Sequence, residues 1–263
     1  MLELQDLGFR FPQRDWVFRH TDLTIASGSI TSILGPNGKG KTTLLRCIAG
    51  LTRPEEGRVL RDPNIGYVPQ ASPSTFAYSV FDMVLMGRAK KVSTFGTPSK
   101  SDLVFTRRVL ERVGIEHLAS ARFTELSGGQ RQLVLIARAL ATDCAFMILD
   151  EPVSALDLRN QAQVLGLLRE LAAEGMGILL TTHHPEHALH LGGDAVIMYG
   201  PDEIVRGEVT ELVTGKNLTR LYGIDVATEV VLDRDSPRTV VYTRYDNFAK
   251  VINDSHLEGS SLA

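Results

Sequence analysis

A glycine-rich loop between a strand pattern and a helix pattern is the first segment whose residue types and spacing suggest chemistry. It comprises Gly35, Pro36, Asn37, Gly38, Lys39, Gly40, Lys41, Thr42 and Thr43. The glycines let backbone N–H groups surround a phosphate, and the helix N-terminus adds partial positive charge. We expect Lys41 to reach the β- and γ-phosphates and the Thr42 hydroxyl to bind Mg²⁺, with Lys39 a solvated charge nearby. A plain glycine-rich turn would not account for the Lys-Thr pair, so the loop predicts a nucleotide-binding site.

Two acidic residues end a buried strand pattern further along the chain. The apolar residues 146–149 are followed directly by Asp150 and Glu151. A strand that ends beside a phosphate loop is where open α/β sheets hold ligands. Asp150 is expected to hold Mg²⁺ through its water, and Glu151 to polarise the attacking water as a general base. A polar turn would explain this pair alone, but beside the phosphate loop it is interpreted as a hydrolytic site.

A third motif identifies a family resemblance. Residues 126–130 read Leu-Ser-Gly-Gly-Gln and precede a helix pattern. With this motif between the other two, residues 2–225 resemble the ATP-binding subunits of ABC transporters. The resemblance implies ATP and Mg²⁺ as cofactors, and a homodimer in which two chains close head-to-tail on two ATP molecules. It also implies that Ser127, Gly128, Gly129 and Gln130 grip the nucleotide held by the partner chain, at a helix start suited to anions.

Other positions match this family one by one. Gln70 resembles the glutamine that senses Mg²⁺ and the attacking water, and Asp157 lies in a segment that crosses the dimer interface. Phe11 resembles the aromatic residue that stacks on adenine, which is normally a tyrosine. Phe9 and Trp16 remain alternatives for that role, and each of the three could instead be a core aromatic residue.

Four histidines lie close together at positions 183, 184, 187 and 190. Their spacing admits a metal site, because His187 and His190 are one helical turn apart. The resemblance favours another interpretation, in which His183 is the switch histidine that contacts the γ-phosphate and orients Glu151 and the water. The other three are then expected to be mostly surface residues of a helix that Pro185 starts.

The segment after Gln70 indicates a membrane partner. Residues 76–98, and the run Val-Phe-Asp-Met-Val-Leu-Met-Gly-Arg at 80–88 above all, resemble the docking segment of bacterial importers for metal chelates and of a molybdate-transporting relative. The resemblance implies transmembrane permease subunits that dock near residues 70–90, and indirectly a substrate-binding protein. An ordinary amphipathic core helix would explain the apolar positions equally well. The ATPase of an exporter and a soluble, non-transport ABC ATPase are the rival functions.

Composition limits the remaining classes. The chain has 263 residues, 43% of them hydrophobic, and a net charge of −3, so no basic field points to nucleic acid as a partner. Two cysteines exclude a disulfide scaffold. Neither a signal peptide nor an apolar run long enough to span a bilayer is recognisable. We therefore expect a soluble chain that is peripheral on the cytoplasmic face of the bacterial inner membrane.

The elements that must position these residues form an α/β pattern. Apolar runs alternate with helical patterns, which predicts a mainly parallel sheet covered by helices. Residues 2–32 read as strands, 58–68 as a strand pair, and 79–87, 101–114 and 130–141 as helices, the second with a Ser101 N-cap. We expect an ABC ATPase domain over residues 1–226, with a RecA-like core, an N-terminal antiparallel β subdomain and a helical subdomain at about 79–140. Residues 227–263 are expected to be a short, partly disordered appendage with one strand near 238–245.

Overall fold

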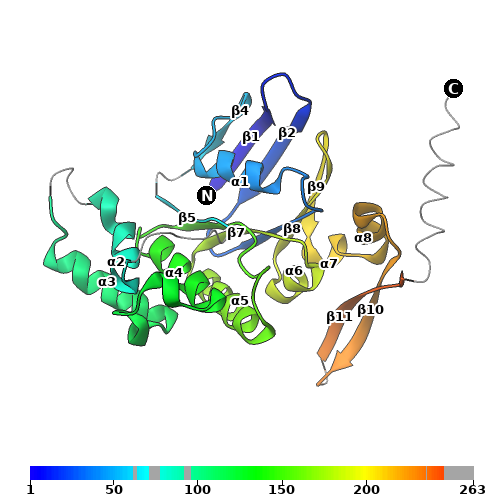
Figure 1. The fold of residues 1–263 in the computed structure, drawn as a ribbon. Coiled ribbons are helices and arrows are strands. Elements are labelled where there is room, and N and C mark those ends of the chain that lie inside the picture. The colour runs from blue at the N-terminus through cyan, green and yellow to red at the C-terminus, as the bar shows by residue number, and fades with distance from the viewer. Residues whose placement is uncertain (62–63, 71–77, 92–95, 235, 246–263) are drawn as a thin grey trace, which may run out of the picture.

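A six-stranded sheet forms the centre of the molecule (Figure 1). The computed structural model describes residues 1–61, 64–70, 78–91, 96–234 and 236–245. The strand order is β5-β6-β7-β3-β8-β9, and all neighbours are parallel except the antiparallel pair β8 and β9. The strands are β3 (Ile30–Leu34), β5 (Ile65–Val68), β6 (Phe146–Leu149), β7 (Gly177–Thr182), β8 (Asp194–Gly200) and β9 (Glu203–Glu208). The predicted mainly parallel sheet is confirmed.

An antiparallel sheet covers one face of this core. Its strands are β1 (Leu2–Arg10), β2 (Trp16–Ile25) and β4 (Glu56–Leu60), in the order β2-β1-β4. The helix α1 (Lys41–Ala49) lies with it, because Leu44 and Ile48 share one buried cluster with residues of β1, β2, β6 and β7. The predicted antiparallel subdomain is confirmed. The predicted strand pair at 58–68 is wrong as a pair, since β4 bonds to β1 and β5 to β6 in different sheets.

Helices cover the opposite face. They are α2 (Val80–Leu85), α3 (Lys100–Val113), α4 (Gly128–Leu140) and α5 (Leu158–Ala173), with 3₁₀ turns η1 (Met86–Lys91), η2 (Glu116–Leu118) and η3 (Phe123–Glu125). Met147 of β6 and Leu180 of β7 belong to the same buried cluster as residues of α3, α4 and α5. Their chain neighbours Ile148 and Leu179 belong instead to the cluster that contains α1. This alternation is the period of a strand buried on both faces. Among the described residues, no helix is both long and apolar enough to cross a membrane.

The N-cap of helix α3 lies two residues earlier than predicted. Its N-cap is Ser99, because the Ser99 hydroxyl accepts the backbone N–H of Asp102 and the Asp102 carboxylate accepts that of Ser99. The predicted Ser101 cap is therefore wrong. A serine followed three residues later by an acid forms a capping box, and Ser101 lacks such a partner. The helix after the Leu-Ser-Gly-Gly-Gln motif likewise begins at Gly128 rather than Gln130.

The C-terminal elements pack beside β8. They are α6 (Pro185–Leu191), α7 (Val209–Leu212) and α8 (Gly215–Tyr222), followed by a hairpin of β10 (Val226–Asp233) and β11 (Ser236–Thr243). Leu218 and Leu221 of α8 share a buried cluster with Ile197 of β8 and Val226 of β10. The strand expected near residues 238–245 is thus one half of a hairpin. The expected disordered end, residues 257–263, lies outside the described residues.

Candidate active site

The glycine-rich loop lies between β3 and α1 and opens onto the first turn of that helix. Gly38 and Gly40 have φ values of +82° and +91°, in the left-handed region that favours glycine. A Cβ atom on Gly40 would lie 2.3 Å from Cγ1 of Val17, so a larger residue would collide with β2. Gly40 is the N-cap and supplies no side-chain acceptor, which leaves the first N–H groups of α1 directed at the loop mouth.

Lys41 carries a buried positive charge at this mouth. Its side chain is 5% exposed, and its ammonium donates to the carbonyl oxygens of Gly35 (2.6 Å) and Pro36 (3.1 Å). Oε1 of Glu151 lies 3.7 Å from Lys41 Nζ. Burial lowers the pKa of Lys41, while the negative charges of Glu151 and Asp150 oppose that shift. The arrangement keeps a cation where an anionic group can reach it.

Asp150 and Glu151 follow β6 directly. Thr181, at the end of the adjacent β7, donates from its hydroxyl to Oδ1 of Asp150 (2.8 Å) and accepts the backbone N–H of Glu151 (2.9 Å). Asp150 is 2% exposed, and Glu151 has a φ of +46°, which is uncommon for a residue with a side chain. No local motif points to Thr181. Its one sequence signal is that it is the penultimate residue of the strand that precedes His183.

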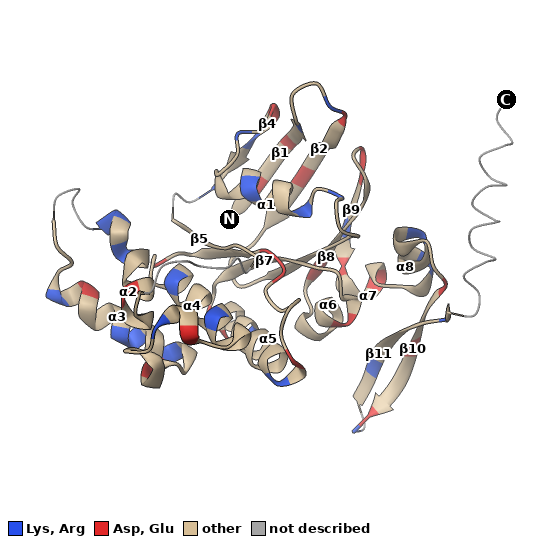
Figure 2. Ribbon diagram, viewed as in Figure 1, with Lys and Arg blue, Asp and Glu red and all other residues tan. Residues whose placement is uncertain are grey.

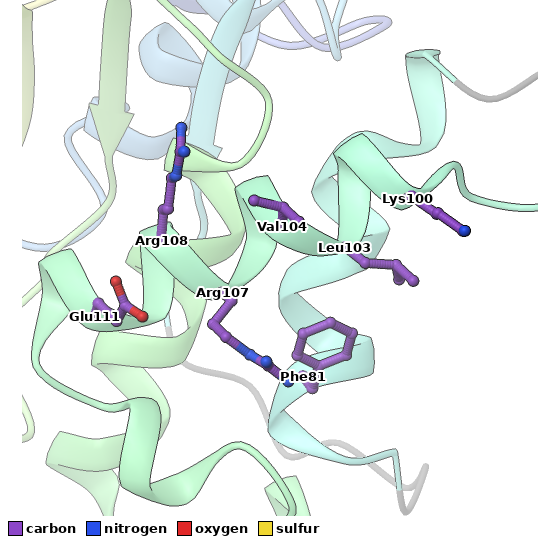
Figure 3. A pocket seen from close by; sticks show the side chains of 7 residues that line it. All are labelled: Phe81, Lys100, Leu103, Val104, Arg107, Arg108 and Glu111. Carbon is purple, nitrogen blue, oxygen red and sulfur yellow. The ribbon is translucent and has the colours of Figure 1, made fainter.

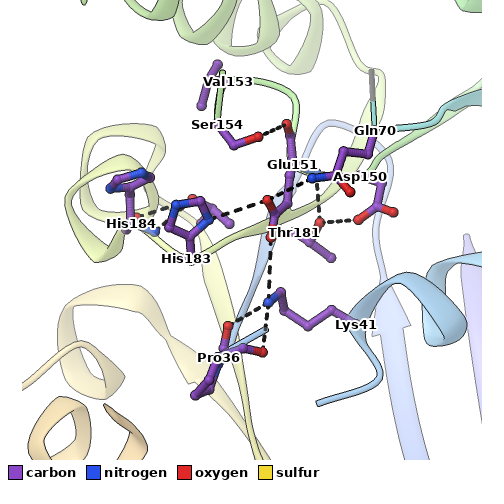
Figure 4. Close-up of polar contacts among 12 residues, drawn as sticks. Pro36, Lys41, Gln70, Asp150, Glu151, Val153, Ser154, Thr181, His183 and His184 are labelled. Atoms are coloured by element: carbon purple, nitrogen blue, oxygen red, sulfur yellow. Dashed lines mark hydrogen bonds and ion pairs between the residues drawn. The ribbon is translucent and has the colours of Figure 1, made fainter. Parts of the chain in front are cut away.

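Two further predicted residues reach the Glu151 carboxylate (Figure 4). Nε2 of Gln70 donates to Oε2 of Glu151 at 3.4 Å, and Nδ1 of His183 lies 3.4 Å from the same oxygen. Gln70 follows β5 and His183 follows β7, so parallel strands deliver both groups to one edge of the sheet. The structure thus brings together Lys41, Gln70, Glu151 and His183, four residues far apart in the sequence.

A pocket of about 350 Å³ lies between the loop and Glu151. Phe11 lines it and is 47% exposed, whereas Phe9 is buried in the core. Trp16 does not line it, and its ring contacts the guanidinium groups of Arg10 at 4.8 Å and Arg19 at 4.6 Å. The geometry therefore favours Phe11 among the three aromatic alternatives. The lining residues are Phe11, Val17, Asn37, Gly38, Gly40, Lys41, Thr42, Thr43, Gln70 and Glu151.

The predicted signature residues lie outside this pocket. Ser127 caps α4 by accepting the backbone N–H of Gln130, whose side-chain oxygen accepts the N–H of Ser127. A Cβ atom on Gly129 would lie 2.3 Å from Cγ of Asn160, so α4 approaches the start of α5 closely. Asp157 caps α5 by accepting the N–H of Asn160 at 2.8 Å. Residues 127–130 and Asp157 thus lie close to one another at the starts of α4 and α5.

The rings of His183, His184 and His187 contact one another in sequence at tilted angles. The His183 and His184 ring centroids are 4.1 Å apart, and those of His184 and His187 are 4.8 Å apart. His187 is 8% exposed, so it is a buried residue and the expectation of a surface position is wrong for it. Burial lowers the pKa of His187. Within the described ranges, no group of three or more His, Cys, Asp or Glu side chains is placed to hold a metal ion.

Comparison with known proteins agrees with this architecture. The family model for ABC transporters matches residues 18–154. The molybdate import ATP-binding protein MolC of Haemophilus influenzae is 41% identical over 222 residues, which cover 84% of this chain and 87% of that protein.

Two solved structures extend the comparison. An ABC transporter of proposed metal-chelate type, in an inward-facing conformation, matches with a TM-score of 0.88 and 38% identity over 94% of this chain and 98% of its own. The dimeric bacterial ABC transporter cassette MJ0796 matches with a TM-score of 0.67 and 26% identity over 80% of this chain and 99% of its own. The chain therefore belongs to the ABC transporter family, as an ATP-binding subunit whose cassette hydrolyses ATP.

Proposed function

We propose that this chain powers the uptake of a metal chelate or a metal oxyanion through a membrane importer. The observation that carries the hydrolytic half is the convergence of Lys41, Gln70 and His183 on the carboxylate of Glu151. The importer half is supported by the MolC relative, which is 41% identical, and by the structure of proposed metal-chelate type. A cargo of iron complex, molybdate or cobalamin is consistent with the docking segment at residues 80–88.

The phosphate loop binds the triphosphate. Backbone N–H groups of residues 38–43 and the helix start surround the β-phosphate, and Lys41 contacts the β- and γ-phosphates. Phe11 at the pocket rim stacks on adenine. The Thr42 hydroxyl, the Gln70 carboxamide and the Asp150 carboxylate are hard oxygen donors, which fit Mg²⁺. When bound, Mg²⁺ supplies positive charge to the phosphate oxygens.

Glu151 acts as the general base. Its carboxylate accepts a proton from the water that attacks the γ-phosphate, and Gln70 and His183 fix the oxygen that faces that water. His183 also contacts the γ-phosphate, so a single group senses both substrate and base. The left-handed backbone of Glu151 directs its side chain into the pocket, and Thr181 holds that backbone.

Two chains enclose two ATP molecules. Residues Ser127, Gly128, Gly129 and Gln130 lie away from Lys41 in one chain, and they complete the site of a second chain across a head-to-tail interface that includes Asp157. The dimeric MJ0796 cassette supports this assembly. ATP binding closes the dimer and hydrolysis reopens it, which drives the membrane subunits between their access states.

The membrane subunits dock beside α2. A groove of about 750 Å³ lies between α2 and α3 (Figure 3), with an apolar floor at Phe81, Leu103 and Val104. Several basic residues lie along α3 (Figure 2), and two of them, Lys100 and Arg107, line the groove. Residues 71–77 and 92–95 of the expected docking segment lie outside the described residues. Docking here makes the chain peripheral at the cytoplasmic face, and the binding protein acts only through the membrane subunits.

Reconstitution tests this function. The chain, its membrane subunits and their binding protein are placed in proteoliposomes, and ATP-dependent uptake of molybdate, a ferric chelate and cobalamin is compared. Uptake of one of them is the expected result. ATP hydrolysis without uptake of any, or ATP-driven export, would favour the rival exporter or soluble ATPase.

A further inference from the structure

The peptide unit that follows His183 is fixed at both of its polar groups. The carbonyl oxygen of His183 accepts a hydrogen bond from the Tyr222 hydroxyl at 3.2 Å. The N–H of the same peptide, which belongs to His184, donates to Oγ1 of Thr182 at 3.1 Å. Because a peptide is planar, two bonds on opposite edges restrict the ψ angle of His183 and therefore the direction of the Cα–Cβ bond from which the ring extends. The ring direction decides whether Nδ1 stays 3.4 Å from Glu151.

The two side chains that bond to this peptide come from different parts of the molecule. Thr182 is the last residue of β7 and directly precedes His183, so its bond is local. Tyr222 is the last residue of α8, 39 positions further along the chain. Its ring packs against the buried cluster of α6, α7, α8 and β8. Burial and the nearby Glu186 raise the pKa of Tyr222, so its hydroxyl remains a proton donor at physiological pH.

The C-terminal hairpin holds α8 in place. Thr219 makes two hydrogen bonds to the backbone of Val226 in β10. Its Oγ1 donates to the Val226 carbonyl (3.1 Å) and accepts the Val226 N–H (3.0 Å). The N–H of Gly215 donates to Oγ1 of Thr228 at 3.1 Å. These three bonds join the start and the middle of α8 to β10. The position of the Tyr222 hydroxyl therefore depends on the hairpin as well as on the helix.

We propose that Tyr222 is a positioning residue for ATP hydrolysis, acting through the backbone carbonyl of His183. The inference rests on the proposed role of His183. A single neutral hydrogen bond has a net value of about 1 kcal/mol, so its loss lowers the equilibrium constant for the correct His183 conformation about fivefold. Loss of the Tyr222 hydroxyl should therefore lower kcat by up to about fivefold. The KM for ATP should change less than kcat, because the phosphate loop holds most of the triphosphate and Tyr222 does not line its pocket.

Tyr222→Phe in the chain assembled with its membrane subunits tests this role, because it removes only the hydroxyl. Tyr199→Phe is the matched control, since Tyr199 packs against the same cluster and its hydroxyl makes no described hydrogen bond to His183. Steady-state ATPase assays give kcat and KM, thermal unfolding gives Tm, and NMR of ¹⁵N-histidine-labelled chain reports the His183 ring. We expect Tyr222→Phe alone to lower kcat and shift the His183 resonances, with a smaller change in KM and a Tm within about 2–4 °C of wild type.

Three other results would overturn the positioning role of Tyr222. Normal kcat in Tyr222→Phe, together with low turnover in His183→Ala, would overturn the positioning role and leave the proposed function intact. Normal turnover in His183→Ala would overturn the proposed role of His183 and this inference with it. Equal losses of kcat and Tm in Tyr222→Phe and Tyr199→Phe would assign the effect to packing and also overturn the inference.

Discussion

At the scale of single residues, Glu151 is held by contacts to both its carboxylate and its backbone. Lys41 lies 3.7 Å from one oxygen, and Gln70 and His183 each lie 3.4 Å from the other. Ser154 donates from its hydroxyl to the Glu151 carbonyl, and Thr181 accepts the Glu151 N–H. A non-glycine residue at φ +46° costs about 1–2 kcal/mol, and these bonds hold it there.

Glu151→Gln should keep ATP binding and lose turnover. The carboxamide has nearly the shape of the carboxylate but cannot accept the proton of the attacking water, so kcat should fall at least about 100-fold. Nucleotide binding by fluorescence titration and phosphate release measure the two effects separately. Glu170→Gln, on the outer surface of α5 beside Arg112, is the control and should hydrolyse ATP normally. Near-normal hydrolysis by Glu151→Gln would remove Glu151 as the base.

Thr181→Val should both destabilise the chain and slow hydrolysis. The variant leaves the Glu151 N–H and the Asp150 carboxylate without the buried hydroxyl, at a cost of about 1–3 kcal/mol in unfolding free energy. Thr31→Val is the matched control on the neighbouring β3. The Thr31 hydroxyl is fully buried and has no hydrogen-bond partner in the described part of the chain, so valine there should be neutral or stabilising. Equal denaturation midpoints for the two variants would refute this reading of Thr181.

At the scale of elements, Asp102 joins two parts of the helical region. It caps α3 through Ser99, and its carboxylate accepts a hydrogen bond from the Arg88 guanidinium of η1 at 3.0 Å. Arg88 also donates to the carbonyl of Ala141, which follows α4. One carboxylate and one guanidinium thus connect η1, α3 and the residue that follows α4.

Asp102→Asn should lower stability in a pH-dependent way. Hydrogen bonds from Ser99 and Arg88 hold the pKa of Asp102 below its usual value. A carboxyl with a depressed pKa stabilises the fold above its unfolded-state pKa of about 4, and the contribution is lost as the pH falls through the folded-state value. The denaturation midpoints of wild type and variant should therefore differ at pH 7 and converge below about pH 4.

Asp233→Asn is the control for that experiment. Asp233 pairs with Arg238 at 3.3 Å on the exposed hairpin, where a surface ion pair contributes little. Its midpoint should match wild type throughout the pH range. A gap between wild type and Asp102→Asn that stays constant down to pH 3 would contradict the proposed titration of Asp102.

The local sequence pattern predicts most helices and strands. It does not predict which strands pair or which residues on other elements a side chain contacts. The apolar runs at 146–149 and 177–182 indicated buried parallel strands, and the phosphate loop and Asp150–Glu151 were found because their chemistry is local in sequence. The 58–68 segment was misjudged because alternation does not state which sheet a strand joins. Ser99 and Ser101 are both plausible caps until the Asp102 contact decides. Thr181 and Tyr222 were missed because each acts through a residue on another element.

At the scale of the whole molecule, the residues of the proposed ATP site fall into two separate groups in one chain. The phosphate loop and Glu151 line one pocket, whereas Ser127 and Gly129 lie at the start of α4 beside Asp157 and Asn160. The Ser127 hydroxyl faces its own helix N-terminus, where an additional anion would be favourable. A second chain related by a twofold axis would place each signature opposite the other chain's phosphate loop.

Ser127→Arg should therefore act on the partner's site. The large cation blocks the start of α4, while the Lys41 pocket of the same chain is untouched, so ATP binding by the monomer should be normal and hydrolysis by the homodimer lost. Mixing Ser127→Arg with Glu151→Gln distinguishes action across the interface from action within one chain. Across the interface, the Ser127→Arg chain keeps a normal Glu151 and meets the normal signature of its Glu151→Gln partner, so one working site is restored. Tandem-tagged heterodimers should then hydrolyse ATP at about half the wild-type rate, whereas a signature acting within its own chain would leave them inactive.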